Sequence, residues 1–251
     1  MKSKKDLKET FYELGIKRGS VVEVHSSLKN LQDVVGGAQS IIDALIEVIG
    51  YEGTIVMPLQ NVYNSEPSNW SNPPIKPSDY DFIRKNTPGG DGKIMDIRHM
   101  GVLVNTFRNY SGVLFSSHPT NAFVAWGKYA RLVVSEQSLD FPLSINSPCQ
   151  KLYDLDAQVL LIDCDFSSAT SLHLGEYISK KRPVIIEGAA VIKDGIRSWE
   201  KYLDIDLDSS DFINVEKIMK NNNLISHIKM DKCNMSYFSL KMAVKVLVKY
   251  L

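Results

Sequence analysis

The segment Thr170–Glu176, which reads Thr-Ser-Leu-His-Leu-Gly-Glu, contains a residue pair suited to proton transfer. On a helix, residues three positions apart lie on one face, so His173 and Glu176 would be close enough to interact. A carboxylate beside an imidazole fixes the orientation of the ring and stabilises the imidazolium formed when the ring accepts a proton. The pair could therefore act as a general base, although spacing alone favours an ordinary surface ion pair.

A second polar group follows a short apolar segment near the N-terminus. Residues 20–25 have the pattern of a buried strand, and His25 at its end is followed directly by Ser26–Leu28. Ligands of open α/β sheets bind beyond the carboxyl ends of the strands, where these residues are expected. Their hydroxyls and backbone N–H groups could hold a phosphate, a pantetheine amide or an oxyanion, or the serines could simply cap the strand.

Two further histidines lie beside residues that could line a site. His118 is followed by Pro119, which forces it into an extended conformation at a loop or strand edge. An ordinary loop residue is the simpler interpretation of His118. His99 follows Arg98 and could line a site or be solvated.

Several common catalytic motifs are absent from the sequence. It contains no Walker-type phosphate loop, Rossmann G-x-G-x-x-G, G-x-S-x-G elbow or zinc-protease H-E-x-x-H. The cysteines Cys149, Cys164 and Cys233 form no C-x-x-C pair, which favours reduced thiols and gives no sign of a metal centre. Nucleotide hydrolysis, nicotinamide redox chemistry and serine-dependent hydrolysis are therefore not expected.

The composition is typical of a soluble globular protein. Of the 251 residues, 44% are hydrophobic and 23% are charged, and 29 basic residues balance 29 acidic ones. This balance supplies no general positive field for nucleic acid or an anionic membrane. No apolar run approaches the ~20 residues that cross a bilayer, and the charged N-terminal segment lacks the apolar centre of a signal peptide. We expect a cytoplasmic protein without nucleic-acid or membrane partners.

The first part of the chain predicts a βαβ unit. Residues 20–25 and 54–57 read as strands, the second ended by Pro58. A helix that opens at Gly36 and Gly37 lies between them. Strand, helix and strand in this order favour a parallel sheet with helices on its faces.

The remaining segments complete one α/β domain. Helices are predicted over residues 4–15, 100–108, 170–178 and 237–251, with a strand over 156–162. Residues 193–195, Lys-Asp-Gly, are a hairpin turn signal. Residues 60–95, rich in Pro, Asn, Ser and Asp, predict either a substrate-facing loop or a mobile surface excursion. We predict a single domain over residues 1–251, a mixed, largely parallel sheet flanked by helices with a long substrate-side loop region.

Taken together and in order, these segments resemble the aminoglycoside 3-N-acetyltransferase family. The resemblance extends over nearly the whole chain, and although each motif alone is weak, the ordered set is specific. The motifs are Val24-His25-Ser26-Ser27-Leu28, Val35-Gly36-Gly37-Ala38, Glu52–Pro58, Arg98-His99-Met100-Gly101, Phe107–Tyr110, Ser116-Ser117-His118-Pro119-Thr120, Ala125–Gly127, Ser147-Pro148 and Thr170–Glu176.

The resemblance implies direct transfer of an acetyl group from acetyl-CoA to an amino group of a sugar-like acceptor, without a metal. It gives His173 the role of general base and makes Glu176 the neighbour that orients it. The enzyme would be a monomer or a homodimer. The resemblance also implies a coenzyme cleft lined by His25, Ser26, Ser27, Leu28, Gly36, Gly37, Arg98, Ser117, His118 and Pro119.

The chain departs from the family pattern on the acceptor side. Ala169 replaces a frequent asparagine, Phe115 a common arginine and Asn105 a frequent glutamate. These changes leave acetyl transfer in place, with the acceptor open between an aminoglycoside antibiotic and an amino-sugar intermediate of glycan or natural-product synthesis. A non-catalytic coenzyme A-binding protein is the alternative of a different class.

Overall fold

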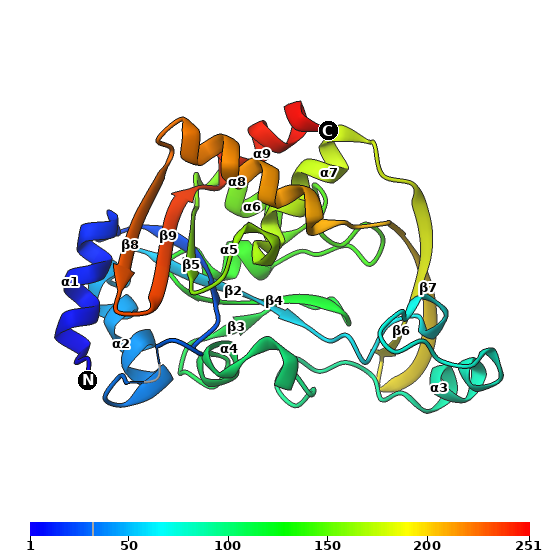
Figure 1. Cartoon of the computed structure of the whole chain (residues 1–251). Helices are drawn as coiled ribbons and strands as arrows, with labels where there is room; N and C mark the ends of the chain where they lie inside the picture. The colour runs from blue at the N-terminus through cyan, green and yellow to red at the C-terminus, as the bar shows by residue number, and fades with distance from the viewer. Residues whose placement is uncertain (32) are drawn as a thin grey trace.

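A seven-stranded mixed sheet forms the centre of the molecule in the computed structural model (Figure 1). The structure describes residues 1–31 and 33–251, apart from the side chain of Arg98. The strands lie in the order β3-β4-β2-β1-β5-β9-β8. Their bounds are β1 (Val21–Ser26), β2 (Thr54–Gln60), β3 (Leu114–Phe115), β4 (Asn121–Gly127), β5 (Gln158–Ile162), β8 (Ile225–Met230) and β9 (Cys233–Ser239).

The three central strands are the parallel ones. β1 pairs in parallel with β2 on one side and with β5 on the other, whereas the other neighbouring strands of the sheet pair in antiparallel fashion. The connection between β1 and β2 is α2 (Gly37–Ile49), which confirms the predicted βαβ unit. The expected mixed α/β fold is confirmed, and its parallel part is confined to the centre. There the carboxyl ends of β1, β2 and β5 share one edge of the sheet.

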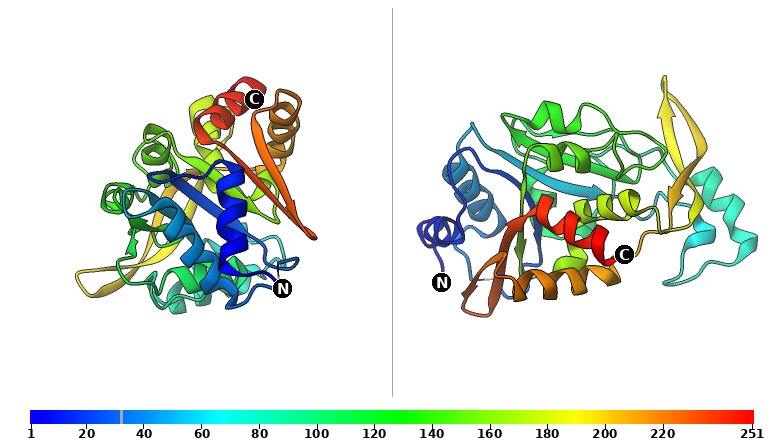
Figure 2. Two further views of the ribbon diagram at one scale, coloured as in Figure 1. Left: turned by 90° about the vertical axis from the view of Figure 1, so that its left-hand side faces the viewer. Right: turned by 90° about the horizontal axis from the view of Figure 1, so that it is seen from above.

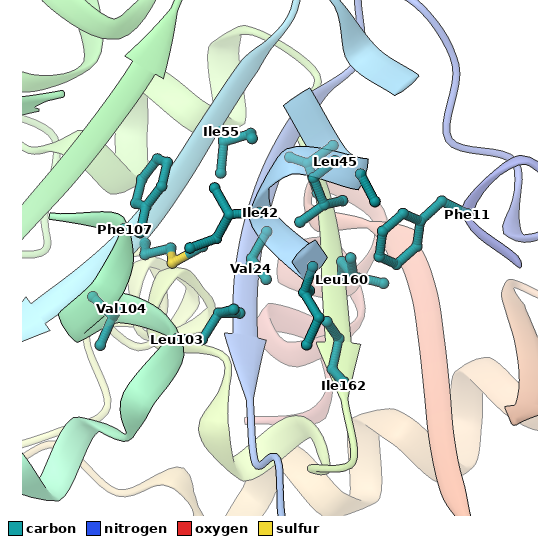
Figure 3. Close-up of a cluster of buried hydrophobic side chains, with 14 of the residues drawn as sticks. Phe11, Val24, Ile42, Leu45, Ile55, Leu103, Val104, Phe107, Leu160 and Ile162 are labelled. Atoms are coloured by element: carbon teal, nitrogen blue, oxygen red, sulfur yellow. The ribbon is translucent and has the colours of Figure 1, made fainter. Parts of the chain in front are cut away.

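Helices cover both faces of the sheet because successive strand residues send apolar side chains to opposite sides. Val24 of β1 packs against one helical layer, where Figure 3 shows it near Ile42 and Leu45 of α2. Val21 belongs to the core on the other face. The first layer contains α1 (Lys4–Leu14), α2 and α4 (Val102–Phe107), and the second contains α5 (Ala130–Val134), α6 (Pro148–Asp154), α7 (His173–Ser179), α8 (Phe212–Asn221) and α9 (Leu240–Tyr250).

The N-terminal helix has caps at both ends. The Ser3 hydroxyl accepts a hydrogen bond from the Asp6 N–H, which satisfies one of the free amides of the first turn. Gly15 follows the last residue of α1 with a φ of 99°, a conformation that glycine adopts without a side-chain clash. The helix predicted over residues 4–15 is therefore confirmed.

The second strand continues through the proline that was expected to end it. β2 pairs with β1 only as far as Val56, but it pairs with β4 from Thr54 to Gln60. Pro58 lies in this second part, opposite Phe123. Since β1 no longer pairs with β2 there, the missing N–H of Pro58 costs no hydrogen bond on that side.

The predicted C-terminal helix begins three residues later than expected. Residues 237–239 belong to β9, in which Tyr237 and Phe238 pair with Leu160 and Val159 of β5. The pairing of these apolar residues with a central strand outweighs their helical spacing. α9 then begins at Leu240, where the Ser239 hydroxyl accepts the Met242 N–H. No helix of the described residues is long and apolar enough to span a membrane.

A hairpin and the long proline-rich segment lie side by side at one end of the molecule (Figure 2). The hairpin consists of β6 (Val184–Lys193) and β7 (Ile196–Ile205), joined at the predicted turn. The segment carries the short helices η1 (Pro67–Asn69) and η2 (Pro77–Asp79) and then α3 (Tyr80–Asn86). The Asn64 side chain joins the two parts, because its amide donates to the Ala190 carbonyl (2.9 Å) and accepts from the Ala190 N–H (2.7 Å).

Candidate active site

His173 is the first residue of α7 and follows a tight turn. The 3-10 helix η5 (Thr170–Leu172) runs directly into α7, so one short segment sets the position of the imidazole. Leu172 and Leu174 on either side are buried in the core. Gly175 permits the close approach of α9, since a Cβ at this position would lie 2.8 Å from the Leu247 side chain.

His173 contacts Glu176 as the helical spacing predicts. The Nδ1 atom of His173 forms a short hydrogen bond with Oε2 of Glu176, whose side chain is completely buried. Because a carboxylate only accepts, Nδ1 carries the hydrogen in this pair. The described residues provide no hydrogen-bond partner for Nε2, and the His173 side chain is 13% exposed. The imidazole can therefore take a proton at Nε2.

The other oxygen of Glu176 is held from outside the helix. Nε of Arg182 lies 2.6 Å from Oε1, and the backbone N–H of Asp208 donates to the same atom at 3.1 Å. Arg182 also pairs with Asp211 at 2.7 Å. The Phe212 ring, which follows Asp211, packs 4.8 Å from the His173 ring. These contacts orient the carboxylate and support the imidazole from a second segment of the chain.

A further carboxyl group lies in the electrostatic neighbourhood of His173. Burial raises the pKa of Asp204, on β7, to about 6. Its Oδ1 accepts the Ile205 N–H at 2.8 Å and a short hydrogen bond from the Tyr177 hydroxyl. The neighbouring His173 acts in the opposite direction on the pKa of Asp204, more weakly than burial.

A cavity of about 240 Å³ lies at the shared edge of the parallel strands. Thr170 contributes to its wall, so the turn that leads into His173 also borders the cavity. Lining residues come from the ends of β1 and β2 and from the segment after β5, as expected for a ligand site in an open α/β sheet. The lining residues are Val24, His25, Ser26, Met57, Pro58, Gln60, His99, Met100, Val104, Cys164, Ser168 and Thr170.

Cys164 does not have the properties of a nucleophile, although it lines this cavity. Burial raises the pKa of its thiol to about 12, so the reactive thiolate is scarce near neutral pH. Among the described residues, no three His, Cys, Asp or Glu side chains are grouped in a way that could hold a metal ion. The cavity wall therefore offers hydroxyl and imidazole groups for binding rather than a thiolate for covalent chemistry.

The expected coenzyme residues divide into those that line the cavity and those that shape its loop. His25 and Ser26 line it, whereas Ser27, Leu28, Gly36 and Gly37 are not part of its wall. The Ser27 N–H donates to the Ile162 carbonyl at 2.8 Å, so it extends the sheet and is not free to bind an oxyanion. Leu28 packs against the core. Gly36, with a φ of 82°, precedes the first residue of α2 and fixes where that helix starts.

Ser117, His118 and Pro119 are not brought to this cavity. His118 is buried, and both of its ring nitrogens are already bonded. Nδ1 accepts the backbone N–H of Thr120 (3.2 Å) and of Asn121 (2.9 Å), so Nε2 carries the hydrogen and donates to the Leu139 carbonyl (3.2 Å). Burial accordingly lowers the pKa of His118 to about 4.

The segment around Arg98 does reach the cavity. His99 and Met100, the next two residues, line it, and the His99 ring meets the Tyr63 ring edge to face at 5.9 Å. The side chain of Arg98, a predicted coenzyme contact, lies outside the described residues.

Four polar residues near His173 have no role that the sequence alone predicts. No spacing in the sequence indicates a role for Ser171, Arg182 or Asp204, because the fold determines which residues they contact. Glu23 did leave a signal, since it is the one charged residue within the apolar strand 20–25. Its side chain is completely buried and accepts hydrogen bonds from the Ser171 N–H (3.3 Å) and hydroxyl.

Comparisons with known proteins agree on one family. A family model described as aminoglycoside 3-N-acetyltransferase matches residues 24–251. The SPbeta prophage-derived aminoglycoside N(3')-acetyltransferase-like protein YokD of Bacillus subtilis (strain 168) is 38% identical over 250 residues, or 99% of this chain and 92% of that protein. The crystal structure of YokD matches with a TM-score of 0.94 at 37% identity, covering 100% of this chain and 98% of that one.

Two more distant proteins extend the agreement. Aminoglycoside N(3)-acetyltransferase IX of Micromonospora chalcea is 30% identical over 216 residues, which cover 82% of this chain and 73% of that protein. A structure of AAC-IIIb in a binary complex with CoASH has the same fold, with a TM-score of 0.86 at 19% identity over 99% of this chain and 96% of that one. The chain therefore belongs to the aminoglycoside 3-N-acetyltransferase family and is an acyltransferase.

Proposed function

We propose that this enzyme transfers the acetyl group of acetyl-CoA directly to an amino group of an aminoglycoside, with His173 as the general base. The observation that carries the proposal is the His173–Glu176 pair. Nδ1 of His173 is hydrogen-bonded to the buried carboxylate of Glu176, and Nε2 of His173 has no hydrogen-bond partner among the described residues. The turn that ends at His173 borders a cavity at the carboxyl ends of the parallel strands.

The proposed reaction forms one bond and breaks one. The acceptor nitrogen attacks the thioester carbonyl as a neutral amine, because an ammonium group has no lone pair to donate. A C–N bond forms, the C–S bond breaks, and the proton released by nitrogen passes to Nε2 of His173. Glu176 stabilises the resulting imidazolium through Nδ1. The sulfur leaves as a thiolate and becomes the thiol of coenzyme A when it takes up a proton.

The donor side of the proposal uses the predicted coenzyme residues that line the cavity. His25 and Ser26 offer polar groups to the pantetheine arm, and the hydroxyls of Ser26 and Thr170 can donate to the thioester oxygen as it becomes negative. Ser27, Leu28, Gly36 and Gly37 hold the loop that carries these groups. The AAC-IIIb complex with CoASH, a protein of the same fold, is consistent with coenzyme A in such a cleft.

An amino sugar with a single positive charge is the second candidate acceptor. The acidic residues Asp204, Asp208 and Asp211, which lie around Tyr177 and Arg182, are already engaged within the protein. Asp204 is held by Tyr177, and Arg182 lies 3.6 Å from Asp208 and 2.7 Å from Asp211. Carboxylates that are compensated in this way attract a polycationic drug less strongly than free ones.

The release of coenzyme A thiol from acetyl-CoA tests the proposal. Purified enzyme is assayed with a kanamycin-type aminoglycoside, with a simple amino sugar and without acceptor, and mass spectrometry identifies the acetylated product. We expect aminoglycoside-dependent thiol release above the hydrolysis measured without acceptor. Turnover of the amino sugar alone would support the second candidate, and no acceptor-dependent release with either compound would contradict both.

A further inference from the structure

Glu23 is a carboxylate in the middle of the central strand, where apolar residues are usual. Its side chain has no exposed surface, and β1 is paired on both sides at this position, with Val56 of β2 and Val159 of β5. It points to the same face of the sheet as Val21, towards the helical layer that contains α7. A buried carboxylate destabilises a fold unless hydrogen-bond donors compensate its charge. Packing alone therefore does not explain why a glutamate occupies this position.

The contacts of Glu23 lead to the turn that precedes His173. The N–H of Ser171 donates to Oε1 at 3.3 Å, and the Ser171 hydroxyl forms a short hydrogen bond with Oε2. The His25 imidazole also lies close to Glu23, with its Nε2 atom 3.1 Å from Oε1. One side chain thus contacts both the cavity-lining histidine and the turn two residues before the proposed base.

The turn needs this support because it has no side-chain cap of its own. Ala169 and Leu172, the residues that precede η5 and α7, form no capping hydrogen bond with their side chains. The free N–H groups at a helix start are normally satisfied by a local Ser, Thr, Asp or Asn. Here a glutamate 148 residues away in sequence accepts the Ser171 N–H instead. The start of the helix that carries His173 is therefore fastened to the central strand of the sheet.

From these contacts we infer that Glu23 is a positioning residue of the acetyl-transfer site, which holds the Thr170–Leu172 turn on β1 and so sets the place of His173. The inference rests on the proposed role of His173 as base. Stability alone does not account for Glu23, because an apolar residue of similar size in a buried position is commonly at least as stable as a charged one. A fixed imidazole does account for it, since small displacements of a catalytic group lower the rate strongly.

Three variants test the inference. Glu23→Gln keeps the shape of the side chain and one acceptor oxygen but removes the charge. Ser171→Ala removes the hydroxyl and keeps the backbone N–H. Glu47→Gln is the matched control, because Glu47 pairs with Lys4 and Lys8 on the surface formed by α1 and α2. Each variant is measured for kcat, for the KM of the amine, for thermal unfolding and for amide hydrogen exchange over residues 168–176.

We expect Glu23→Gln to lower kcat on the order of 10-fold to 100-fold with the KM of the amine unchanged, because the base is displaced while the acceptor still binds. Amide exchange should become faster over residues 168–176 and not elsewhere. Ser171→Ala should have a smaller effect in the same direction. The double variant should resemble Glu23→Gln alone, since both substitutions disrupt the same interaction, the one between Glu23 and the Ser171 hydroxyl. Glu47→Gln should match the unmodified enzyme.

Unchanged exchange over residues 168–176 in Glu23→Gln would overturn the inference. So would a loss of kcat accompanied by faster exchange throughout the protein, because that pattern reports general destabilisation. Failure of the proposed function would look different. If the unmodified enzyme transfers no acetyl group, the exchange measurement still shows whether Glu23 holds the turn.

Discussion

The molecule contains two histidine–glutamate pairs that are built into different elements. His173 and Glu176 lie three residues apart on α7, whereas His25 and Glu23 lie two residues apart on β1. Both glutamates are completely buried. In the helix pair, Nδ1 bonds the carboxylate and Nε2 is left without a partner in the described structure. In the strand pair, Nε2 lies 3.1 Å from the carboxylate but is not aligned for a hydrogen bond.

The surroundings of the two glutamates differ as well. Glu176 also binds Arg182 and a backbone N–H, so its charge is compensated when His173 is neutral. Glu23 instead receives the N–H and hydroxyl of Ser171. A histidine beside a buried carboxylate is therefore not enough to define a base. The helix pair leaves a ring nitrogen available for a proton. In the strand pair, Glu23 links β1 to the turn that precedes α7 through its hydrogen bonds with Ser171.

Replacing His173 is expected to have the largest effect on activity. His173→Ala removes the proton acceptor, and we expect kcat/KM for acetyl transfer to fall by about 100-fold to 10,000-fold. His227→Ala is the matched control, because His227 lies on the edge strand β8 and contacts Ser236. An unchanged rate in His173→Ala would contradict the role of the helix pair. Coenzyme A binding without turnover in the unmodified protein would favour a non-catalytic coenzyme-binding protein.

His118 sharpens the comparison because it is a buried histidine held by backbone groups and not by a carboxylate. Burial lowers the pKa of His118 from 6.5 to about 4. Below pH 6.5 the unfolded chain binds a proton that the folded protein refuses, so stability falls as the pH falls from 6.5 to 4. We expect this histidine to remove about 3 kcal/mol of the free energy of unfolding across that window. Denaturant unfolding as a function of pH measures it.

The variant His118→Asn isolates this contribution. Asp204 acts in the opposite sense, because burial raises its pKa from 3.8 to about 6 and the folded state binds the extra proton between these values. The Asp204 contribution is present in both proteins and cancels when the unmodified enzyme is compared with His118→Asn. Parallel stability curves for the two proteins between pH 6.5 and 4 would show that His118 is not responsible.

Replacing His25 is expected to have the smallest of these effects. If the strand pair contributes to donor binding and not to proton transfer, His25→Asn should raise the KM for acetyl-CoA by about tenfold, the equivalent of one hydrogen bond. The kcat at saturating acetyl-CoA should change less than the KM. A fall in kcat as large as that of His173→Ala would remove the distinction between the two pairs.

Local patterns in the sequence were sufficient for the parts of the fold that depend on near neighbours. The first helix, the βαβ unit and the turn at Asp194 and Gly195 follow from spacing, capping and turn chemistry, and the contact between His173 and Glu176 follows from helical geometry. Features that depend on pairing between distant segments could not be predicted from local sequence patterns. Pro58 lies inside a strand because β2 stays paired with β4 after its pairing with β1 has ended, and this depends on the sheet order.

The same limit applies to the site. The contacts of Glu23 with Ser171 and of Arg182 with Glu176 and Asp211 depend on how α7 sits on the sheet, which no short motif encodes. The family resemblance supplied the role expected of His173, but not these supporting residues. The placement of His118 is likewise a property of the folded chain, because its bond to the Leu139 carbonyl, 21 residues away in sequence, forms only when two loops meet.

The close packing of α7 on α9 at Gly175 has a consequence for biosynthesis. Leu247 occupies the space that a side chain at position 175 would need, and β9, just before α9, completes the sheet beside β5. While the chain is being made, the segment with His173 emerges from the ribosome well before these partners do. Its helix then has an apolar face without its final cover, so the proposed active site can take its folded form only after α9 has been synthesised and has packed against α7.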